Sequence, residues 1–116
     1  MKSYTDLSQS KKLAEFLPLE SADMRIGNYV GKSGKVDGTN VHYYLKGESF
    51  GAPEIIYAWS LTALMDVLDR GALFKTPKGW ACQTYIEYKA ITSDYYNNPI
   101  DACVAMIENL HEQNLL

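Results

Sequence analysis

The sequence predicts an α+β fold, in which one antiparallel sheet of four to five strands carries about three helices, mainly on one of its faces. Two observations support this class. Several segments alternate apolar and polar residues with a period of two, which is typical of strands with one wet face. Other segments repeat apolar residues at helical spacing. In chain order they give α-β-β-α-β-β-α, and helices layered on one side of a sheet bury both apolar surfaces.

The first half of the chain is expected to form one helix and two strands. Ser3 offers a capping-box-like start for a helix over residues 4–17, and Pro18 ends that helix because proline has no backbone N–H to donate. Alternation then predicts strands over residues 24–30 and 41–46, joined by a glycine-rich hairpin loop.

The middle of the chain gives the clearest helix. Residues 55–59 are a candidate short strand, and Ser60 follows as an N-cap whose hydroxyl can accept from a free backbone N–H of the first turn. Gly71 is the expected C-cap, because glycine adopts the left-handed conformation at low cost. The buried stripe of this helix is expected to be Leu61, Leu64, Met65 and Leu68.

The last third predicts two strands and a helix. Residues 80–89 alternate, and residues 90–96 are a shorter candidate strand. Asn98 is the expected N-cap of the final helix, with Pro99 at the first helical position, where its missing N–H costs nothing. The buried stripe is expected to be Ile100, Cys103, Val104, Ile107 and Leu110.

Length and charge limit the class of protein. The 116 residues predict a single α+β domain over 1–116. A net charge of -3 shows no basic footprint, so a nucleic-acid partner is not favoured. No apolar run approaches the roughly 18 residues that span a bilayer, and the polar N-terminus does not resemble a secretory signal. We therefore expect a soluble, cytoplasmic protein without a membrane partner.

One segment resembles a nucleotide-binding motif but departs from it. The sequence G-N-Y-V-G-K-S at Gly27–Ser33 is one residue shorter than a P-loop. A P-loop also leads directly into a helix whose N-terminus faces the phosphates. Here Gly34 and Gly38 follow, which disfavours a helix, so no cofactor is expected and the segment is interpreted as a hairpin tip.

No catalytic or metal-binding set is expected either. His42 and His111 stand in different elements, and neither has a second ligand at helical or turn spacing. Cys82 and Cys103 occupy apolar-face positions without C-x-x-C spacing, which favours free core thiols over a disulfide. There is no G-x-S-x-G elbow. The sequence thus predicts no enzyme, no cofactor and no metal.

Tyrosine is unusually frequent, with nine in the chain. Tyr29, Tyr44 and Tyr85 fall on the outward side of predicted strands and are the candidate interaction face. Such a face can simply cover a sheet, contact a protein partner or a second copy, or stack on the bases of a single strand. The negative total charge makes base stacking the least favoured of the three.

Three stretches together resemble a family of small uncharacterised proteins encoded by prophages and mobile elements of gut Bacteroidetes. They are L-P-L-E-S-A-D-M at 17–24, W-S-L-T-A-L-M-D-V-L at 59–68 and N-P-I-D-A-C-V-A-M-I at 98–107, with Gly79, Trp80 and Cys82 between them. The resemblance covers most of the chain but not the loop at 27–40. It implies a phage-related accessory protein of the bacterial cytoplasm and no particular activity.

The function expected from these observations is protein–protein binding or self-association by a phage or mobile-element accessory protein. Two alternatives remain. One is a nucleic-acid-binding regulator of the antitoxin-like kind, and the other is an enzyme with an unrecognised site.

Overall fold

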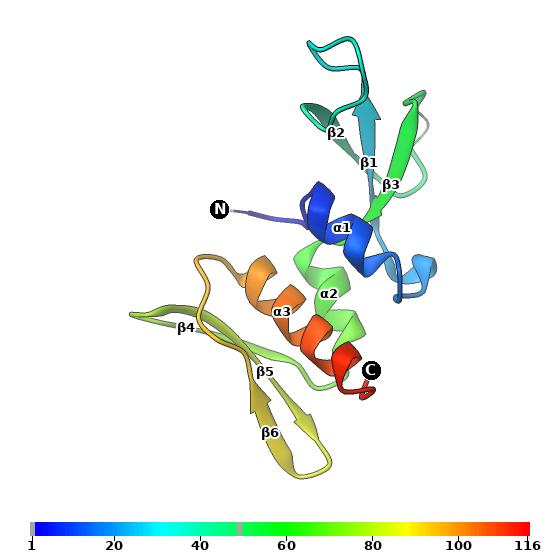
Figure 1. The fold of residues 1–116 in the computed structure, drawn as a ribbon. Helices are drawn as coiled ribbons and strands as arrows, with labels where there is room; N and C mark the ends of the chain where they lie inside the picture. Colours follow the sequence, from blue (N-terminus) through cyan, green and yellow to red (C-terminus); the bar gives the residue numbers. More distant parts are fainter. Residues whose placement is uncertain (1, 49) are drawn as a thin grey trace. The chain divides into compact units, whose positions relative to one another are not determined.

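The computed structural model describes residues 2–48 and 50–116, and its chain divides into two compact units (Figure 1). One unit is Asp6–Trp59. The other consists of the chain up to Thr5 together with Ser60–Leu116, and is called the Ser60–Leu116 unit below. The prediction of a single domain over 1–116 stays a prediction, and each unit is described by itself.

The Asp6–Trp59 unit is a three-stranded antiparallel sheet with a helix against it. The strand order is β2-β1-β3, and α1 packs against β3. The elements in chain order are α1 (Leu7–Leu13), the 3₁₀ turn η1 (Leu19–Ser21), β1 (Met24–Tyr29), β2 (Asn40–Leu45) and β3 (Glu54–Ala58). The three strands confirm the alternation at 24–30 and 41–46 and the short strand at 55–59.

The core of this unit lies on one face of the sheet. Ile26 in the central strand is fully buried and pairs in register with Ile56 of β3 and Tyr43 of β2. The remaining members of the cluster are Ala58, Leu7, Met24 and Val41. Because side chains alternate along a strand, this inward set leaves the opposite face to the residues between them.

Helix α1 is shorter than the sequence predicts. It begins at Leu7 rather than Tyr4, because the capping box forms at Asp6 and not at Ser3. The Asp6 carboxylate accepts from the Gln9 backbone N–H at 2.8 Å, and the Gln9 side chain accepts from the Asp6 N–H at 3.1 Å. This reciprocal pair satisfies two donors that the first turn leaves open.

The Ser60–Leu116 unit has its own three-stranded antiparallel sheet, in the order β4-β5-β6. Its elements are α2 (Leu61–Val67), β4 (Ala72–Thr76), β5 (Gly79–Ile86), β6 (Lys89–Thr92) and α3 (Pro99–Glu112). Helix α3 packs against β5 and against α2 (Figure 1). The predicted single sheet of four to five strands, in the order α-β-β-α-β-β-α, is therefore wrong. There are two sheets of three strands, and β4 was not predicted because Ala72–Thr76 lacks period-two alternation.

The helix starts of this unit are confirmed. The Ser60 hydroxyl accepts from the Ala63 N–H, and the Asn98 side chain accepts from the Asp101 N–H at 2.8 Å, with Pro99 at the first position of α3. Every residue of the predicted α3 stripe is buried. The expected C-cap at Gly71 is wrong, because α2 ends at Val67 and Leu68 already has extended backbone angles.

Candidate functional site

The outward face of the β2-β1-β3 sheet gathers most of the aromatic side chains of the Asp6–Trp59 unit. Alternation in β1 turns Arg25 and Tyr29 away from Ile26. The strand register then sets Tyr44 of β2 and Tyr57 of β3 on either side of Arg25. We call this surface the aromatic face; it consists of Arg25, Tyr29, His42, Tyr44, Phe50, Ile55 and Tyr57.

Three rings of the aromatic face converge over Gly27. The hydroxyls of Tyr29 and Tyr44 are 2.8 Å apart, and Phe50 stacks on Tyr44 with 4.0 Å between ring centroids and 6° between planes. A Cβ atom at position 27 would lie 2.9 to 3.1 Å from all three rings. Glycine is therefore required here for close packing.

The two tyrosine hydroxyls are held as a pair. The hydrogen bond with Tyr44, together with burial, raises the pKa of Tyr29 above its ordinary value. The ring of His42 meets the Tyr29 ring edge-on, with centroids 5.4 Å apart.

The same face carries an open hollow of about 430 Å³ beside Arg25. The Arg25 guanidinium lies over the Tyr57 ring, 5.0 Å from its centroid. Ile55 is 49% exposed. The hollow is lined by Arg25, Glu48, Phe50, Ile55 and Tyr57.

The structure separates the three tyrosines of the predicted interaction face. Tyr29 and Tyr44 meet on the aromatic face, whereas Tyr85 lies on β5 in the other sheet and the other unit. Two further aromatic members were missed. Tyr57 could have been found, because it shares the outward side of the candidate strand 55–59 with Ile55. Phe50 lies in a loop without periodicity, so nothing in the sequence points to its position.

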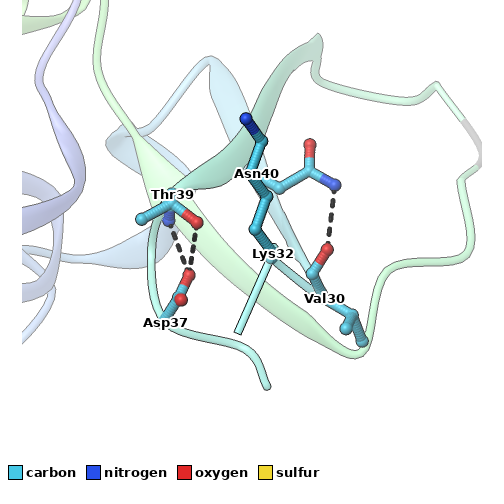
Figure 2. Close-up of a pocket in the computed structure, with 6 residues that line it drawn as sticks. Val30, Lys32, Asp37, Thr39 and Asn40 are labelled. Atoms are coloured by element: carbon cyan, nitrogen blue, oxygen red, sulfur yellow. Dashed lines mark hydrogen bonds between the residues drawn. The ribbon is translucent and has the colours of Figure 1, made fainter. Parts of the chain in front are cut away.

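The hairpin loop between β1 and β2 holds residues 30–33 of the P-loop-like segment, whose first three residues belong to β1, and a second open hollow of about 550 Å³ (Figure 2). The Asp37 carboxylate accepts from the backbone N–H and hydroxyl of Thr39, at 3.0 and 2.5 Å, and from the Ser33 hydroxyl at 2.6 Å. These hydrogen bonds lower the pKa of Asp37 to about 2. The loop leads into β2, not a helix, and the ionised Asp37 lines the same hollow as Lys32. This arrangement does not suit a phosphate.

The histidines lie apart in the structure. His42 is on β2, where its Nε2 is 3.0 Å from the Asn40 side-chain oxygen, and His111 is in the last turn of α3. Within residues 2–48 and 50–116, no three His, Cys, Asp or Glu side chains are grouped so that they could hold a metal ion.

The two cysteines are free and fully buried between β5 and α3. Cys82 and Cys103 share a hydrogen bond, which lowers the pKa of Cys82 and raises that of Cys103. Cys103 Sγ also lies 3.7 Å from Met65 Sδ. The predicted core role of both thiols is confirmed.

Comparison with known proteins finds no matching family model, no similar curated protein and no similar solved structure. In the part of the chain that the structure describes, no helix combines the length and apolar character needed to cross a membrane.

Proposed function

We propose that this chain is a non-enzymatic accessory protein of phage or mobile-element origin that acts in the cytoplasm by binding a protein through its aromatic face. The observation that carries the proposal is the cluster of partly exposed rings over Gly27, with the exposed Ile55 beside it. Aromatic residues and arginine are enriched where proteins contact one another. The resemblance to prophage-encoded proteins supports the proposed phage or mobile-element origin. The aromatic face supports the proposed binding to a protein.

The way the rings pack favours a protein over a nucleic-acid strand. A nucleic-acid base stacks on a free ring face. On this surface Phe50 covers one face of Tyr44, and Arg25 lies over Tyr57. The exposed aliphatic side chain of Ile55 and the partly exposed rings suit the mixed contacts of a protein interface.

A nucleic-acid-binding regulator is the second candidate. It is favoured by Lys32 and Lys35, which are exposed on the hairpin loop of the same unit. Binding of this kind releases counterions, so it should weaken steeply as salt rises. A gel-shift series over salt concentration tests it, and the absence of any shift at low salt removes this candidate.

Site-specific photo-crosslinking in the native host tests the leading proposal. A benzophenone amino acid replaces Ile55 on the aromatic face; in the control it replaces Val36, which is also exposed but lies on the hairpin loop. We expect a protein adduct from position 55 and little or none from position 36. Equal labelling at both positions, or no adduct at position 55, would contradict protein binding through this face.

A further inference from the structure

The hollow on the aromatic face carries both signs of charge. Arg25 and Glu48 both line it, together with the apolar side chains of Phe50, Ile55 and Tyr57. Neither charged group has an ion-pair partner among the residues that the structure describes. The patch therefore presents an arginine and a glutamate that are both available to a partner.

We infer that the partner is a second copy of this chain, related by a two-fold axis through the aromatic face, with Arg25 of each copy facing Glu48 of the other. This inference rests on the proposed function. In a two-fold interface, if one residue contacts a second, the second contacts the first across the axis. A patch that holds one cation and one anion is therefore complementary to itself.

The geometry of Arg25 suits this role. The guanidinium of Arg25 lies over the Tyr57 ring, 5.0 Å from its centroid, and this cation–π contact restrains it. A restrained arginine loses less freedom when it forms paired hydrogen bonds with a carboxylate. A partner with only acidic or only basic groups would leave Glu48 or Arg25 unmatched, which disfavours that partner.

Apolar side chains lie beside the two charges and would be buried in the same dimer interface. Ile55 and the rings of Phe50 and Tyr57 lie in the same hollow as the two charges. In the dimer they form the apolar part of the interface, next to the two Arg25–Glu48 contacts.

Charge reversal tests the inference. The wild-type chain is expected to form a dimer in sedimentation velocity at micromolar concentrations. Arg25→Glu and Glu48→Arg should each weaken self-association by more than about tenfold, because each places like charges opposite one another. An equimolar mixture of the two variants should form a heterodimer, since both contacts then join opposite charges. The double variant R25E/E48R should dimerise like the wild type for the same reason.

The control is Lys35→Glu, which reverses a charge on the exposed hairpin loop and should leave the dimer intact. Circular dichroism and thermal melting verify that each variant is folded. A monomeric wild type, reversals without effect, or a mixture that stays monomeric would each overturn the inference.

Mass spectrometry of the adduct at position 55 separates this inference from the proposed function. An adduct with a peptide of the same chain supports both. If the adduct joins a different protein, protein binding stands and the second copy is refuted. No adduct refutes both.

Discussion

Asp37 shows how a single side chain can order a loop. Its carboxylate accepts three hydrogen bonds from Ser33 and Thr39, and Gly31 donates its N–H to the Lys35 carbonyl at 2.8 Å across the same loop. A carboxylate accepts these bonds fully only when it is ionised. The order of the loop is therefore linked to the ionisation of Asp37.

We expect Asp37 to titrate near pH 2 instead of its ordinary value of 3.8. Because the folded pKa is below the unfolded one, the stabilisation is complete above the ordinary value and is lost as the pH falls from about 4 towards 2. A carboxyl-carbon NMR titration measures this. Ser33→Ala should raise the pKa of Asp37, because it removes one of the hydrogen bonds to the carboxylate. Lys32→Ala, on the same loop, should change the free energy of unfolding by less than about 0.5 kcal/mol. A midpoint near 3.8 in the wild-type protein would contradict the role given to the hydrogen bonds.

At the scale of elements, α3 is the helix whose start and buried face are most fully encoded by neighbouring residues in the sequence. Asn98 caps its start, Pro99 occupies the first position, and the apolar stripe faces β5 and α2. Its central residue Ile107 is fully buried, as is Leu64 in α2. Both residues therefore belong to the interior of the Ser60–Leu116 unit.

Leu64→Ala and Ile107→Ala should each lower the free energy of unfolding by about 2–5 kcal/mol, because each leaves a cavity in a packed interior. Glu112→Ala, in the exposed last turn of α3, is the control and should change it by less than about 0.5 kcal/mol. Denaturant unfolding followed by circular dichroism gives the values. A cost near zero for either core variant would mean that the side chain is not packed as described.

At the scale of the whole molecule, the chain contains two tryptophans, one in each compact unit. Trp59 belongs to the Asp6–Trp59 unit and is fully buried, and its indole N–H donates to the Ser21 hydroxyl at 2.9 Å. Trp80 lies on β5 of the Ser60–Leu116 unit, with the Lys75 ammonium over its ring. Each ring can therefore report the unfolding of its own unit.

If residues 1–116 fold as the single domain that the sequence predicts, both units should unfold in one transition. Each variant keeps a single tryptophan: Trp59→Phe keeps Trp80 in the Ser60–Leu116 unit, and Trp80→Phe keeps Trp59 in the Asp6–Trp59 unit. For each variant, the fluorescence and circular-dichroism midpoints in denaturant should coincide. In either variant, a fluorescence midpoint that differs from the circular-dichroism midpoint would show that the two units unfold independently.

The sequence by itself determined the features that depend on near neighbours along the chain. The caps at Ser60 and Asn98, the stripe of α3 and the alternation of β1 follow from a few consecutive residues, because hydrogen bonds and helical spacing act over one or two turns. Even for these local features, two neighbouring residues can compete to cap the same helix. The capping box at Asp6 replaced the expected start at Ser3, since Gln9 could return a hydrogen bond.

Only the tertiary structure decided which strands share a sheet and which rings share a face. Period two shows that Tyr29 and Tyr85 point outward, but it cannot assign them to different sheets. Strand pairing joins residues far apart in the chain, such as Ile26 with Ile56. Phe50 reaches the aromatic face from a loop because the middle strand carries Gly27, whose missing side chain leaves room for three rings. That contact depends on three-dimensional packing, which no local pattern encodes.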